Sequence, residues 1–224
     1  AAALAAVHYL RPQGRMMLGG SVGLKGNGMV FNWSLLQRYA WSASLTEDID
    51  YHMSLLMAGE RVTFAPDAVV WAEMPAALQD ATTQNVRWEQ GRLELARRYV
   101  PILLRSSWQR RGTPGAVSPF TLIDAAIEHL IPPFSALMAL SLLALFLALG
   151  LRSTPALILV GLIFMGQAIY LGSGLMLAGM PLGVYRALLF TPLFLSWKLW
   201  LYLRVLVGVE QQGWVRTKRS QERK

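Results

Sequence analysis

The chain has 224 residues, of which 54% are hydrophobic, and a formal net charge of +8 at pH 7. Charged side chains gather in residues 1–130 and in the last ten positions, whereas residues 134–209 carry few of them. This division predicts a water-facing part followed by a membrane part. Basic residues flank the apolar stretch, as on the cytoplasmic side of membrane proteins, so we expect membrane lipid and no nucleic acid as their partner.

The first 41 residues predict one helix, a glycine-rich loop and a short helical stretch. Residues 1–10 are expected to form a helix that ends before Pro12, and the start is too short and too weakly basic for a signal peptide. We therefore expect the natural N-terminus to lie upstream. Residues 16–28 predict loops with close backbone approach, and residues 33–41 predict a helical turn. The absence of cysteine excludes disulfides and a cysteine nucleophile.

The next part of the chain predicts a mixture of helices and strands. Thr46 is expected to cap a helix over residues 47–58, which places two acidic residues beside its positive end. A long helix with a polar, arginine-rich face is expected over residues 78–99. Short strands are expected at residues 29–31, 61–64 and 68–72. This order of elements predicts an α/β sheet domain.

Residues 120–130 predict an amphipathic helix at the membrane surface. Its apolar residues cluster on one side, and Asp124, Glu128 and His129 lie on the other. A helix with this pattern places its apolar side in lipid and its polar side in water.

Three apolar runs follow. Residues 134–151 and 155–176 are each long enough to cross a bilayer core of roughly 30 Å. The third run, residues 185–207, contains Lys198, and a lysine at a helix centre costs about 2.5–3.5 kcal/mol on insertion scales. Two crossings keep the basic tail on the starting side, so we interpret this run as an interfacial helix. A third spanning helix is the alternative.

Two short motifs in the polar part carry candidate chemistry. Thr46-Glu47-Asp48 places carboxylates at a loop-to-helix junction, where one of them could accept the proton of an attacking hydroxyl. The three residues Gln84, Arg87 and Trp88 share one helix face, because they are three and four positions apart. An arginine there could offset charge on a diphosphate, and a tryptophan could stack on a sugar ring.

In this order and ahead of membrane helices, the two motifs resemble those of the membrane-integrated family 2 glycosyltransferases, which include cellulose, chitin, hyaluronan and poly-N-acetylglucosamine synthases. The resemblance implies that Asp48, beside Glu47, is the catalytic base, and that Thr46, Gln84, Arg87 and Trp88 contact the diphosphate and the acceptor. It also implies a sugar-pocket segment at Gly26, Asn27 and Gly28, and a gating loop that contains Trp214, Thr217 and Arg219.

The resemblance implies a fold and an organisation as well. Residues 1–112 would form the back half of a GT-A-type, Rossmann-like α/β domain, and residues 113–133 a linker and an interface helix. Residues 134–209 would form the membrane region, and residues 210–224 a basic cytoplasmic tail. We expect the front half of the catalytic domain upstream of Ala1, and no activity from the given chain without it.

The implied reaction is an inverting transfer from a nucleotide sugar, in particular a UDP-sugar, to a glycan or lipid-linked acceptor at the cytoplasmic face of the plasma membrane. The resemblance implies a divalent cation (Mg or Mn) held by a D-x-D motif upstream of this chain. Asp48-Ile49-Asp50 also has that pattern, but it overlaps the base motif, so we interpret Asp50 as a supporting or helix-surface residue. A non-catalytic membrane scaffold or a small transporter subunit is the alternative, although Gln167 alone stands out as polar within the expected spans.

Overall fold

The computed structural model describes residues 6–41, 44, 46–70, 78–110 and 116–207, apart from the side chains of residues 78–80, 83 and 206. The chain divides into two compact units. We call one the apolar unit (Ala1–Gly14 with Pro132–Trp200) and the other the polar unit (Arg15–Ile131 with Leu201–Lys224). Each is described by itself.

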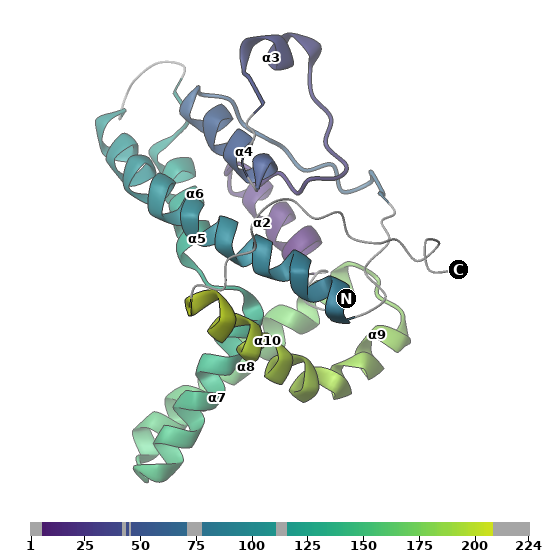
Figure 1. Ribbon diagram of the computed structural model, residues 1–224, viewed down its shortest axis with the longest axis vertical. Helices are drawn as coiled ribbons and strands as arrows, with labels where there is room; N and C mark the ends of the chain where they lie inside the picture. Colours follow the sequence, from purple (N-terminus) through teal and green to yellow (C-terminus); the bar gives the residue numbers. More distant parts are fainter. Residues whose placement is uncertain (1–5, 42–43, 45, 71–77, 111–115, 208–224) are drawn as a thin grey trace. The chain divides into compact units, whose positions relative to one another are not determined.

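The polar unit is built around three helices, α4 (Glu47–Met57), α5 (Leu78–Gln109) and α6 (Pro119–Leu130), which Figure 1 shows lying together. Their apolar faces form one core, because residues three and four positions apart on each helix point the same way. The core residues are Met53 and Leu56 from α4, Leu95, Tyr99, Val100 and Leu103 from α5, and Val117, Leu122, Ala125 and Ala126 from α6 and the segment before it.

Two shorter helices precede this core. Helix α2 (Arg11–Met17) continues directly from a π-helical turn, η1 (Ala6–Leu10), so the helix does not end before Pro12 as the sequence predicted. Loops were predicted over residues 16–28; Met16 and Met17 instead belong to α2, whereas residues 18–28 form irregular backbone as predicted. Helix α3 (Trp33–Arg38) lies in the segment between the glycine-rich residues and α4 (Figure 1). It is capped by Asn32, whose side chain accepts a hydrogen bond from the Ser34 amide.

The apolar unit contains α7 (Phe134–Gly150) and α8 (Thr154–Leu177), which lie side by side in Figure 1. Gln167 donates a hydrogen bond to the Ser141 hydroxyl across this pair, at 2.8 Å. The turn η1 packs on α8 at Gly174, where an added Cβ would lie 2.8 Å from the Cα of Ala6. The remaining helices of the apolar run are α9 (Leu182–Ala187), η2 (Leu188–Phe190) and α10 (Thr191–Leu206).

Among the described residues, two helical stretches are long and apolar enough to cross a membrane, namely Thr154–Leu177 and Leu182–Val205. A third span arises only if α6 and α7 are counted as one bent pair, because α7 alone has 17 residues. The chain is therefore compatible with membrane association. The length and composition of Leu182–Val205 favour the spanning alternative for the third apolar run.

The predicted α/β, Rossmann-like GT-A fold is wrong for the part of the chain that the structure describes, because these residues form helices and loops without a strand. Two of the three predicted strands, residues 29–31 and 61–64, are irregular, and so are residues 68–70 of the third. Strand residues need a neighbouring strand to take up their backbone groups. Here one backbone hydrogen bond joins the amide of Val22 to the carbonyl of Val62, at 2.9 Å, and Val30 is 96% exposed.

Helix α6 departs from the sequence interpretation in its orientation. Its polar side, expected in water, is turned inward: His129 is buried, and the Asp124 and Glu128 side chains are only 23% and 15% exposed. Phe120 and Leu130 are instead 49% and 59% exposed. The buried side of α6 also contains Leu122, Ala125 and Ala126, so it mixes acidic and apolar residues that the sequence interpretation placed on opposite sides. The sequence did not show that the buried Arg15 would pair with the acidic residues of this helix.

The core formed by α4, α5 and α6 predicts that substitutions of two neighbouring leucines of α5 change the free energy of unfolding by very different amounts. Leu103 is fully buried, whereas Leu104 is 44% exposed. We expect Leu103→Ala to lower the free energy of unfolding by about 2–5 kcal/mol, because it leaves a cavity in the core. Leu104→Ala, the matched control, is expected to change it by about 0.5 kcal/mol or less. Denaturant unfolding of the detergent-solubilised protein measures both, and equal effects would contradict this packing.

Candidate functional site

Thr46, the first residue of the acidic motif, lies against α5. It occupies the position before α4, as predicted, but its side chain makes no capping hydrogen bond and is buried. A Cβ added to Gly91 would lie 2.5 Å from Thr46 Cγ2 and 2.8 Å from its Oγ1. Only glycine leaves room for this approach of the α4 N-terminus to α5.

This contact joins the first residue of the acidic motif to α5 close to the second predicted motif. Arg87 lies one helical turn before Gly91 on α5, so both residues point to the same side of the helix. Gln84 and Arg87 are half-buried and Trp88 is 43% exposed. The Arg87 Nε is buried and has no hydrogen-bond partner among the residues that the structure describes. Sequence reasoning missed Gly91, although a glycine in the interior of a long helix was a signal of close packing.

Asp48 lies beside the glycine-rich segment that was predicted to line the sugar pocket. A Cβ on Gly26 would lie 3.3 Å from Asp48 Oδ2, and Gly26 has a φ of +77°, a conformation that other residues rarely adopt. Asn27 is exposed, and Gly28 lies against Val70, 2.8 Å from the position of an added Cβ. Glu47 is exposed. The structure thus places Gly26 of the predicted sugar-pocket segment against the half-buried Asp48 carboxylate.

The environment of Asp48 suits a group that accepts a proton. Burial raises the pKa of this carboxyl above its ordinary value of 3.8, and the nearby Glu47 charge raises it further. The Ile49 amide, which donates to Asp48 Oδ1 at 2.8 Å, and the Lys25 ammonium lower the pKa. The net direction is upward. A carboxylate with a raised pKa binds a proton more readily than a free one, which is the requirement for a general base.

Asp50 has a structural environment instead. It is buried, it accepts a hydrogen bond from the Tyr99 hydroxyl at 2.6 Å, and it forms an ion pair with Arg98 at 3.5 Å. No group of three or more His, Asp or Glu residues with metal-binding geometry occurs in the described part of the chain. The described residues therefore do not form the site of the implied divalent cation, whose ligands the resemblance places upstream of this chain.

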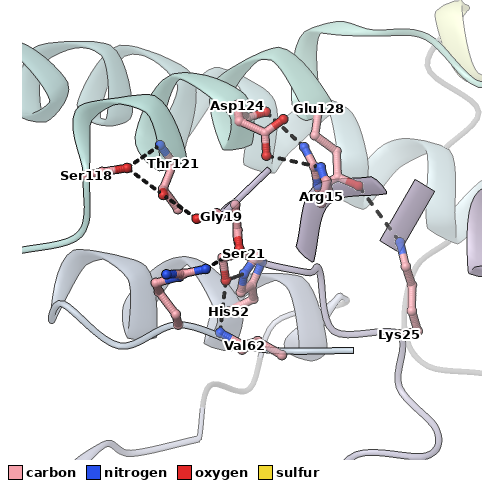
Figure 2. Close-up of polar contacts among 12 residues, drawn as sticks. Arg15, Gly19, Ser21, Lys25, His52, Val62, Ser118, Thr121, Asp124 and Glu128 are labelled. Atoms are coloured by element: carbon pink, nitrogen blue, oxygen red, sulfur yellow. Dashed lines mark hydrogen bonds and ion pairs between the residues drawn. The ribbon is translucent and has the colours of Figure 1, made fainter. Parts of the chain in front are cut away.

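A second cluster of polar side chains ties the segment before Gly26 to α6 (Figure 2). Arg15 is buried and forms ion pairs with Asp124, at 3.1 Å, and with Glu128. Ser21 is hydrogen-bonded to the His52 Nε2 at 2.9 Å and accepts from the Val62 amide at 3.0 Å. The sequence did not identify Arg15 or Ser21 as site residues. Their burial depends on partners far away in the chain, and no local sequence pattern indicates such contacts.

The predicted gating residues Trp214, Thr217 and Arg219 lie outside the described residues, so their role stays a prediction.

The family described as Glycosyl transferase family group 2 matches residues 2–208. The chain belongs to this family. It is therefore a glycosyltransferase of the general kind that takes a nucleotide-sugar donor and an acceptor. Comparison with curated proteins and with solved structures gave no match.

The approach of Thr46 to Gly91 gives a first test of this glycosyltransferase site. Gly91→Ala places a methyl group where Thr46 already lies, so we expect a loss of about 1–3 kcal/mol in unfolding free energy. The double variant Gly91→Ala/Thr46→Ala removes the clashing atoms and should recover most of that loss. Thermal unfolding in detergent measures both.

The control is Gly166→Ala in α8, where an added Cβ meets nothing within 4 Å. It should leave stability unchanged or slightly higher, because alanine favours helices. If Gly91→Ala is as stable as Gly166→Ala, the close approach of the two elements is wrong.

His52 gives a second test. Burial, with Arg15 and Lys25 nearby, lowers its pKa from 6.5 to about 3 in the folded protein. Between these values the unfolded chain binds a proton that the folded chain does not, so stability is present above pH 6.5 and is lost as the pH falls. The expected slope is up to roughly 1.4 kcal/mol per pH unit.

Thermal unfolding from pH 7.5 to pH 5 measures this slope. The glycosyltransferase carrying His52→Asn should show a shallower slope than the wild type, with the remainder coming in part from His129, whose pKa burial also lowers. Identical slopes in the two proteins would show that His52 is not held neutral.

Proposed function

We propose that this glycosyltransferase transfers a sugar from a UDP-sugar to a glycan or lipid-linked acceptor at the cytoplasmic face of the plasma membrane, with inversion at the anomeric carbon. The observation that supports it most is the place of Asp48. This carboxylate has a raised pKa, lies against Gly26, and belongs to the first turn of α4. The residue before that helix, Thr46, lies against Gly91 of α5, one turn after Arg87.

The proposed reaction is a single displacement. The acceptor hydroxyl gives its proton to the Asp48 carboxylate while its oxygen bonds to the anomeric carbon, and the bond from that carbon to the diphosphate oxygen breaks. The electron pair of that bond leaves with the diphosphate. Because attack and departure occur on opposite faces, the configuration inverts.

The remaining residues of the site hold and stabilise the reactants in this proposal. Arg87 has a buried Nε without a partner, so it can offer a hydrogen bond and a positive charge to a diphosphate oxygen. The half-exposed ring of Trp88 offers a face for an acceptor sugar. Gln84 lies on the same helix face as both and can donate an amide hydrogen bond. In this proposal the Gly26–Gly28 segment lies beside the sugar, since Gly26 contacts Asp48 and Asn27 is exposed.

The membrane setting of the proposal rests on two stretches that are apolar and long enough to span a bilayer. A processive polysaccharide synthase, of the cellulose or hyaluronan synthase kind, is the finer form of this proposal. Gln167, the residue that stood out as polar within the expected spans, donates a hydrogen bond to Ser141 and so helps to pair α7 with α8.

The base assignment is tested by Asp48→Asn in the full-length protein in membranes. Removal of a general base is expected to lower the rate of sugar transfer by about 10²–10⁴-fold, because the amide cannot accept the hydroxyl proton. Membrane insertion and thermal stability should stay near wild type. Radiolabelled sugar incorporation gives the rate.

Asp67→Asn is the matched control, since Asp67 is an exposed aspartate in a turn of the same unit. Its transfer rate should equal that of the wild type. A rate for Asp48→Asn within a few-fold of this control would rule out Asp48 as the base.

A further inference from the structure

The glycine-rich segment that reaches Asp48 lies along the inward, polar side of α6 (Figure 2). Three side chains on one face of this helix, spaced by three and four positions, meet the segment at successive points. The first is Thr121, whose hydroxyl donates a hydrogen bond to the Gly19 carbonyl at 3.3 Å. The second is Asp124, whose Oδ2 lies 3.0 Å from a Cβ built on Gly20. The third is Glu128, whose Oε2 lies 3.5 Å from a Cβ built on Gly23.

Two cations bind the segment to α6. Arg15 forms ion pairs with Asp124 and Glu128 and donates to the Asp124 carbonyl at 2.9 Å, while its own carbonyl accepts from the Gly20 amide at 2.8 Å. At the other end Lys25 Nζ lies 4.0 Å from Glu128 Oε1. The Glu128 carboxylate is thus shared between Arg15 and Lys25.

Glu128 stays ionised although it is almost completely buried. Burial alone would raise the pKa of its carboxyl, but the charges of Lys25 and Arg15 outweigh burial and lower the pKa to about 2. A buried carboxylate that keeps its charge needs its cations in place, since water cannot replace them. Glu128 is therefore ionised near neutral pH and attracts the Lys25 ammonium, which lies 4.0 Å away.

Lys25 is the residue before Gly26, which lies against Asp48 Oδ2. The charged groups that face Asp48 among the described residues are Glu47 from its own helix and Lys25 from the glycine-rich segment. The ion pair between Glu128 and Lys25 thus determines where the Gly26 backbone lies beside the Asp48 carboxylate. It also determines the position of Lys25, one of the two charged groups that act on this carboxylate.

We propose that Glu128 and Lys25 are positioning residues for sugar transfer, with Glu128 of α6 holding Lys25 and so the Gly26 backbone against Asp48. The proposal rests on the proposed role of Asp48 as the base. It gives α6, whose last residue lies four positions before the start of α7, a direct part in shaping the reaction site.

The test measures sugar transfer by the full-length protein in membrane vesicles across pH. Lys25→Met is expected to lower kcat roughly 10- to 100-fold with little change in KM for the donor, because a small displacement of a reacting group has effects of this size. Loss of the positive charge should also move the acidic limb of the pH profile to higher pH. Lys25→Arg keeps the charge and should restore most of kcat and the position of the limb.

Glu128→Gln should lower kcat in the same way, and the double variant Lys25→Met/Glu128→Gln should be no slower than the slower single variant, as expected for residues that act through one contact. Lys25→Met keeps the test valid if Glu128→Gln fails to fold, because the Lys25 side chain is 30% exposed and its loss leaves Arg15 paired. Arg38→Met and Glu60→Gln are the matched controls, since they break an exposed ion pair at 3.6 Å in the same unit.

The outcomes separate this proposal from the proposed function. If Asp48→Asn abolishes transfer while Lys25→Met keeps the wild-type kcat and pH profile, the positioning role is overturned and the base assignment stands. If Lys25→Met lowers kcat without moving the limb, and Lys25→Arg fails to restore it, the role is overturned as well. If Asp48→Asn keeps its activity, the proposed function fails and the positioning role fails with it.

Discussion

The buried ion group of Arg15 with Asp124 and Glu128 is the constraint on which the polar unit depends. It joins residues more than 100 positions apart in the chain, and it does so where water is largely excluded. Charges in such a place must be paired, because an unpaired buried charge costs several kcal/mol. The pairing therefore fixes which side of α6 faces inward and where the glycine-rich segment lies along it.

The inward turn of the acidic face has a consequence for the outer side of α6. Phe120, Ile127 and Leu130 are left exposed on a helix that leads into the apolar unit. Such a face is unfavourable in water and favourable in the headgroup region of a bilayer. The membrane-surface role of this helix stays an expectation, with which these exposed apolar residues are compatible, and the inward acidic residues contact the glycine-rich segment of the proposed site.

The second organising contact is the approach of Thr46 to Gly91. It joins the N-terminus of α4, which carries Asp48, to the α5 turn after Arg87. Two close approaches to glycine, at Gly26 and at Gly91, thus surround the acidic motif from two different segments. Both depend on the absence of a side chain, so the proposed site of this glycosyltransferase is shaped by backbone as much as by its charged groups.

The sequence by itself determined the local elements and the candidate motifs. Helices α4 and α6 begin and end within a residue or two of their predicted bounds, because apolar periodicity and capping residues act over a few positions. The tertiary structure decided the rest. The predicted strands failed because pairing depends on a distant partner, which residues 29–31 and 61–64 do not have here. The place of Asp48 beside Gly26, the pairing of Arg15 with α6 and the fit of Gly91 to Thr46 likewise join segments far apart in the chain. No local pattern encodes such contacts.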